Sequence, residues 1–195
     1  MYRQIKDIKI QTCVETIKKM SKWAGNLGTA WYPVKTDLEV NAKRIDVYQN
    51  PPYSWKHMGS GFKKEYSVLG NDCYVTEGSL ILATIWALRA MRTLETFCSN
   101  MMEQMAINTD APMGDSVSSA YNNSLKNYQS TFMQFISSGV ILAANIDKTP
   151  AWKRMKCNSH TEAYLLLNDI LKESQEVTIS ISAFLKNTGI DENFV

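Results

Sequence analysis

Three polar side chains near residue 40 could bind a ligand together. Asp37, Asn41 and Arg44 stand four and three residues apart within LGTAWYPVKTDLEVNAKR, residues 27–44. In a helix that begins at Pro33, this spacing puts them on one face. A carboxylate, an amide and a guanidinium can accept and donate several hydrogen bonds at once, which suits a polyhydroxylated or amide-bearing headgroup. The segment therefore predicts a binding site for a polar group, and a solvated helix face with local charge pairing is the alternative.

A tryptophan and an arginine in a distant apolar run could complete such a site. Trp86 and Arg89 lie three residues apart in SLILATIWALRAMR, residues 79–92. One helical turn separates them, so both can reach the same ligand. A tryptophan in an apolar helix is also commonly a core residue, and core packing is the alternative for Trp86.

The residue types predict no catalytic centre, cofactor or metal site. Neither segment offers a nucleophile beside a base. Cys157 and His160 have the spacing of two zinc ligands, but a structural zinc site needs a second pair, and His57 is equally uninformative. An enzyme is therefore the lowest-ranked hypothesis.

Composition predicts one domain spanning residues 1–195. The chain is 45% hydrophobic, enough for a substantial core, and its net charge of +2 gives no electrostatic footprint for nucleic acid. The four cysteines are scattered and the amino terminus lacks the apolar region of a signal peptide, so we expect a reduced, cytoplasmic protein. The longest apolar run meets Arg89 well before the ~20 residues needed to cross a bilayer.

Apolar periodicity predicts an all-α protein of about eight helices, with no alternating strand pattern. The helices that must position the polar residues are the second, which follows Pro33, and a long apolar one. The predicted helical ranges are 2–23, 33–50, a short irregular helix within 54–71, 76–105, 115–144, a short helix that opens at 149–152, and 159–186.

These segments, taken in order, resemble the glycolipid transfer protein family. The resemblance runs from about Asn26 to the carboxyl end. It rests on LGTAWYPVKTDLEVNAKR with the following VYQNPP, on Trp86-Ala-Leu-Arg89, on AYNNSLKNYQSTFMQF and on the terminal ENFV. It implies a two-layer sandwich of helices that encloses an apolar lipid pocket beneath a polar headgroup site.

The resemblance also implies a role for each polar residue. Asp37 would accept hydrogen bonds from the lipid amide and a sugar hydroxyl. Asn41 and Arg44 would hold the first sugar, although the family usually has lysine where Arg44 stands. Trp86 would be the platform beneath the sugar ring, and Arg89 would orient Asp37 or contact the headgroup.

Three further positions depart from the family pattern. Gln129 replaces the histidine that pairs with the acyl-amide carbonyl; it keeps an N–H donor, and a buried core glutamine is the alternative. Thr131 replaces a membrane-facing tryptophan. Phe194 replaces a tyrosine near the headgroup site, keeping the ring and losing the hydroxyl.

Apolar residues near Thr131 could supply the membrane contact instead. We expect this role for Phe132, Phe135, Ile136 and Trp152, because aromatic side chains favour the headgroup level of a bilayer.

The resemblance also separates two branches of the family. The ceramide phosphate branch has lysine at the position of Asn41 and arginines at those of Trp86 and Leu82, so this chain fits a neutral glycolipid better.

The sequence therefore predicts a non-catalytic, monomeric carrier that binds one glycolipid, a glycosphingolipid, and moves it between membranes through transient contacts with their surfaces. The alternative is a lipid sensor or helical scaffold that binds sphingolipid or a protein partner without efficient transfer.

Overall fold

A computed structural model describes residues 7–28, 31–128, 137–139, 141–142 and 147–191. Across these ranges the chain forms helices and two isolated β-bridges, Lys9 with His57 and Pro112 with Pro150, so the all-α prediction is confirmed. The helices are α1 (Ile10–Asn26), α2 (Tyr32–Asp46), α3 (Met58–Leu69), α4 (Leu80–Ile107), α5 (Gly114–Ser124), α7 (Ala151–Arg154) and α8 (His160–Thr188), with 3-10 turns η2 (Val47–Gln49), η3 (Gly70–Tyr74) and η4 (Lys126–Tyr128).

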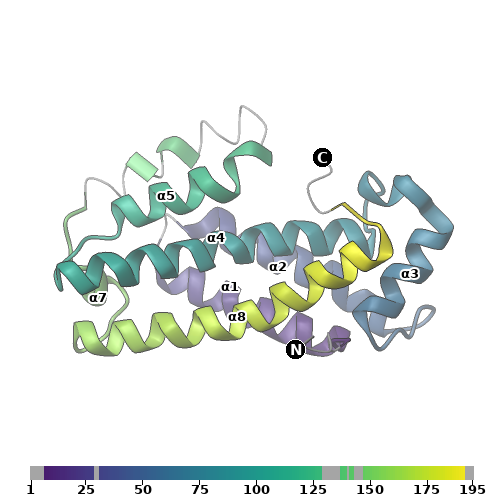
Figure 1. Ribbon diagram of the computed structural model, residues 1–195, viewed down its shortest axis with the longest axis horizontal. Helices are drawn as coiled ribbons and strands as arrows, with labels where there is room; N and C mark the ends of the chain where they lie inside the picture. Colours follow the sequence, from purple (N-terminus) through teal and green to yellow (C-terminus); the bar gives the residue numbers. More distant parts are fainter. Residues whose placement is uncertain (1–6, 29–30, 129–136, 140, 143–146, 192–195) are drawn as a thin grey trace.

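The long apolar helix α4 is the centre of a two-layer sandwich. It packs against α2, α5 and α8, and α1 pairs with α2. Figure 1 shows α4, α5 and α8 in front and the fainter α1 and α2 behind them. Apolar side chains from both layers are fully buried between them, Phe97 and Leu88 from α4 and Leu38 from α2 among them. Within the described part of the chain, no helix is both long and apolar enough to cross a membrane.

Two predicted helix boundaries were wrong by the largest margins. The first helix begins at Ile10, because residues 8–9 run beside residues 56–58, with Met58 N donating to Ile8 O at 2.9 Å. The helix predicted over 115–144 stops at Ser124 and continues as the η4 turn. Its last residues, Asn122, Asn123 and Ser124, have low helix propensity.

Helix α3 is regular, although two glycines led us to predict a short irregular helix. Both glycines are buried. A Cβ added at Gly59 would lie 2.7 Å from the ring of Phe184, and one at Gly61 would lie 2.7 Å from Leu80. The glycines therefore let α3 approach its neighbours closely, and this packing outweighs the propensity cost of about 1 kcal/mol each.

A buried carboxylate holds the start of α4. Glu65 accepts from Tyr48 Oη at 2.8 Å and Leu80 N at 2.8 Å through one oxygen, and from Ser79 Oγ at 2.9 Å and Ile81 N at 2.7 Å through the other. Negative charge at a helix N-terminus is stabilising. We call these five residues the cap cluster. Burial and Glu65 together raise the pKa of Tyr48, which favours its protonated hydroxyl as a donor.

Two further polar contacts join α4 to α8. Ser174 and Thr178 donate to Glu95 at 2.6 and 2.9 Å, and Arg92 Nη2 donates to Ser182 Oγ at 2.8 Å. Burial raises the pKa of Glu95, and the two hydroxyl donors oppose that rise. These contacts fix the register of α4 against its neighbour.

Candidate headgroup-binding site

The predicted polar face lies on α2, where Pro33 stands in the first turn. Asn41 is 2% exposed, and its Nδ2 donates to the backbone carbonyl of Asp37 at 2.8 Å. Its Oδ1 is buried and accepts no hydrogen bond from the residues that the structure describes. A buried acceptor without a donor costs about 1–3 kcal/mol. Such an atom marks a position where a donor from a ligand would be favoured.

Asp37 adds a second acceptor one turn before Asn41. Its side chain is partly buried. Burial raises the pKa of its carboxyl group, and the nearby positive charge of Arg44 opposes that rise. A carboxylate with part of its hydration removed gains most from donors that a ligand brings.

Arg44 lies at the rim of this face. Its Nη2 is 3.6 Å from Oε1 of Glu77, whose side chain is 92% exposed, in the loop that precedes α4. An ion pair with so exposed a partner contributes little to stability. The guanidinium can therefore turn to a ligand at small cost.

The second half of the site lies on α4. Arg89 is 4% exposed, and its guanidinium carbon lies 4.9 Å from the ring centroid of Trp86. The same carbon lies 3.8 Å from the ring centroid of Tyr128 on η4. Stacking of a guanidinium over aromatic rings is favourable, more so when water is excluded. Arg89 therefore links α4 to η4, and its guanidinium already covers one face of the Trp86 indole.

Helix α2 packs directly on α4, so the two halves lie on neighbouring helices. The predicted headgroup residues that the structure describes are Asp37, Asn41, Arg44, Trp86 and Arg89, and we call them the headgroup cluster. Gln129 and Phe194, predicted for the same site, lie outside the described residues.

Sequence reasoning missed two residues beside this cluster. Tyr128 stacks on Arg89. Its position directly before Gln129, in AYNNSLKNYQSTFMQF, could have indicated a place near the site. Trp31 caps α2, packs edge-on against Phe97 at 4.7 Å between centroids, and has a buried indole nitrogen that donates to none of the described residues. Its place two residues before Pro33 was visible, but its burial was not.

Of the predicted membrane contacts, only Trp152 is described; Phe132, Phe135 and Ile136 lie outside the described residues. Trp152 is partly exposed on α7, and its Nε1 donates to Asp110 at 3.1 Å. Ile107, at the end of α4, is 91% exposed three residues before Asp110.

Among the described residues, no group of three or more acidic, histidine or cysteine side chains could hold a metal ion.

A family model described as glycolipid transfer protein matches residues 8–149. Solved structures share the fold at low sequence identity. A mutant of the Arabidopsis protein accelerated-cell-death 11, complexed with ceramide-1-phosphate, has a TM-score of 0.79 and 11% identity, over 99% of this chain and 90% of that one. No curated protein sequence matches the chain.

Two more structures show that this fold serves both kinds of ligand. Human ceramide-1-phosphate transfer protein, in complex with its lipid, has a TM-score of 0.75 and 16% identity, over 97% of this chain and 91% of that one. A fungal glycolipid transfer protein has a TM-score of 0.72 and 17% identity, over 95% and 89%.

Proposed function

The chain belongs to the glycolipid transfer protein family, and from this we propose that it is a non-catalytic, cytoplasmic carrier of one neutral glycolipid. In this proposal residues 1–195 act as one monomeric domain. The ligand is a glycosphingolipid, whose amide and sugar hydroxyls meet the headgroup cluster. Its chains lie between the two helix layers.

The buried Oδ1 of Asn41 is the observation that carries this proposal. It lies one helical turn from the partly buried carboxylate of Asp37, so α2 offers two acceptors close together. An amide N–H and sugar hydroxyls supply donors to such a pair. Two acceptors would instead repel the oxygens of a phosphate, which needs clustered donors.

The α4 side supports the same choice. Trp86 offers an aromatic face for a sugar ring, and Arg89 is already stacked on aromatic rings rather than extended as a phosphate ligand. Because Arg89 lies over one face of Trp86, a sugar would stack on the other. Leu82, one turn before Trp86, adds no charge.

Transfer itself follows from burial energetics. Each methylene leaving the bilayer costs about 0.8 kcal/mol, so a two-chain lipid escapes unaided very rarely. A protein that replaces bilayer contacts with its own apolar interior removes most of this barrier. We propose that the protein docks transiently through Phe132, Phe135, Ile136 and Trp152, binds the headgroup, and withdraws the lipid without any covalent step. Gln129 and Phe194 complete the headgroup site.

Transfer of fluorescent lipid between vesicles tests this function. We expect the wild-type protein to move a glycosphingolipid faster than ceramide-1-phosphate. Asp37→Val and Trp86→Ala should each abolish transfer while helical circular dichroism stays intact. Thr36→Val is the matched control, because Thr36 is exposed on the neighbouring face of α2 and should tolerate the change.

Two results would overturn the assignment. Wild-type transfer rates in both variants would remove the headgroup cluster from the mechanism. Faster transfer of ceramide-1-phosphate by the wild-type protein would place the chain in the other branch. Equilibrium binding measured beside transfer separates a carrier from a lipid sensor, since a sensor binds glycolipid and moves none.

A further inference from the structure

Helix α7 and its flanks form a basic segment around an interfacial tryptophan. Residues 147–157 hold four basic side chains and one acidic one, Asp147, which pairs with Arg154. Lys153 Nζ lies 5.1 Å from the ring of Trp152, so positive charge and aromatic surface coincide. Figure 1 shows α7 at one end of the long axis, beside the end of α4.

A second basic feature lies between α1 and α2. A hollow of about 430 Å³ is lined by three lysines, one carboxylate and three small or amide residues: Lys18, Lys22, Lys35, Glu39, Ser21, Gly25 and Asn26. The stem of Lys35 passes over Gly25, where an added Cβ would lie 3.2 Å from its Cδ. The missing side chain at Gly25 leaves room for this lysine at the wall of the hollow.

The turn after α1 connects the two features. A Cβ added at Gly28 would lie 4.0 Å from Nη1 of Arg154, so α7 lies against this turn. Gly28 lies three residues after Gly25 and two after Asn26, and both of these residues line the hollow. The hollow and α7 therefore belong to neighbouring parts of the surface, and we call them together the basic end.

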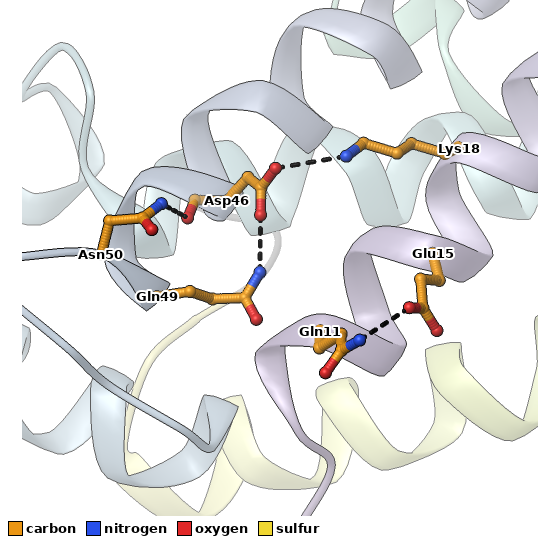
Figure 2. Close-up of polar contacts among 6 residues, drawn as sticks. All are labelled: Gln11, Glu15, Lys18, Asp46, Gln49 and Asn50. Carbon is orange, nitrogen blue, oxygen red and sulfur yellow. Dashed lines mark hydrogen bonds and ion pairs between the residues drawn. The ribbon is translucent and has the colours of Figure 1, made fainter.

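Not all of this charge is neutralised within the protein. Lys18 pairs with Asp46 at 3.2 Å (Figure 2), and Lys35 lies 3.6 Å from Glu39. Lys22, Lys148, Lys153 and Lys156 are exposed and form no ion pair with any residue that the structure describes. The basic end therefore offers four uncompensated cations, on a chain whose net charge is only +2.

We propose that the basic end docks the protein on anionic bilayers, with Lys22, Lys153 and Lys156 beside acidic phospholipid headgroups and Trp152 at the headgroup level. This deepens the proposed function, since it names the membrane from which the carrier works. Each lysine near an anionic bilayer gains about fivefold in binding, and tryptophan prefers the same interface. In this proposal the hollow lined by Lys18, Lys22 and Lys35 binds the headgroup of one acidic phospholipid.

Vesicle flotation without any glycolipid tests the docking separately from carriage. Phosphatidylcholine vesicles with and without phosphatidylserine are compared, at low and at high salt. We expect wild-type protein to float with the anionic vesicles and to be released by salt. Lys153→Glu/Lys156→Glu should lower this binding by at least about thirtyfold, because losing each lysine costs about fivefold and each glutamate adds repulsion. Lys22→Glu should lower it less.

The matched control is Lys63→Glu/Lys64→Glu, which makes the same change of charge on exposed residues of α3, at the opposite end of the molecule (Figure 1). It should bind anionic vesicles as the wild type does. Equal loss in both double variants, equal binding to the two vesicle types, or no vesicle binding at all would overturn the proposal. Transfer between neutral vesicles reports the carrier function independently, so loss of one leaves the other measurable.

Discussion

The cap cluster and the headgroup cluster both join α4 to its neighbours, yet they use their polar groups differently. In the cap cluster, four donors surround the Glu65 carboxylate at 2.7–2.9 Å. In the headgroup cluster, the side-chain N–H of Asn41 donates to the Asp37 carbonyl in its own helix. Its buried side-chain oxygen has no donor among the described residues. The Glu65 carboxylate is satisfied within the protein, whereas the Asn41 oxygen is not satisfied by any residue that the structure describes.

This difference indicates that the cap cluster stabilises the fold and supports the proposal that the headgroup cluster binds a ligand. A buried polar group with all its partners stabilises one arrangement of the helices, whereas an unsatisfied one lowers stability until a ligand supplies the partner. Substitutions in the two clusters should therefore change different measurements. The cap cluster should control the free energy of unfolding, and the headgroup cluster should control affinity.

The largest expected effect is that of Glu65→Ala. The change removes the acceptor of Ser79 Oγ and Ile81 N, whereas Tyr48 Oη can still donate to Gly78 O and Leu80 N to Tyr48 Oη. Each buried unsatisfied group costs about 1–3 kcal/mol, so we expect the free energy of unfolding, measured by urea denaturation, to fall by at least about 2 kcal/mol.

Glu39→Ala is the control for Glu65→Ala. Glu39 is exposed, and its ion pair with Lys35 at 3.6 Å should contribute less than about 1 kcal/mol. Equal losses of stability in the two variants would show that the cap cluster has no special role in holding α4.

An intermediate effect is expected for Asn41→Leu, in affinity rather than stability. Leucine has the shape of asparagine and removes the buried unsatisfied oxygen, so unfolding should shift by no more than about 1 kcal/mol in either direction. Glycolipid binding, followed by fluorescence titration, should weaken about tenfold through loss of one hydrogen bond to the ligand. A strongly destabilised protein with unchanged affinity would reverse the comparison between the clusters.

The smallest effect concerns the pH dependence of stability at Asp37. Burial raises the pKa of Asp37 above its ordinary value, so the folded protein favours the protonated form. This contribution is fully present below the unfolded pKa of about 3.9 and is lost as pH rises through the folded pKa. Between these values, wild-type stability should therefore fall relative to that of Asp37→Asn as pH increases. Parallel stability curves for the two proteins would contradict the raised pKa.

Periodicity alone predicted much of this fold. The apolar spacing of α4 and α8 and the proline in the first turn of α2 located three of the main helices. The four-three spacing of Asp37, Asn41 and Arg44 predicted their common face. Such features are local, because helix geometry relates residues that are near in sequence. The end of α5 at Ser124 was missed because apolar residues continue past it, although its asparagines and serine were visible.

What the sequence by itself determined is the helical class, the polar face of α2, and the resemblance that joins it to Trp86 and Arg89. Only the tertiary structure decided that α3 is regular despite Gly59 and Gly61, since the close neighbours that favour glycine there come from distant segments. It alone placed Arg89 over the rings of Trp86 and Tyr128, and buried the oxygen of Asn41 without a donor among the described residues. The physical reason is that burial and hydrogen-bond satisfaction depend on which helices pack together, and sequence spacing carries no such information.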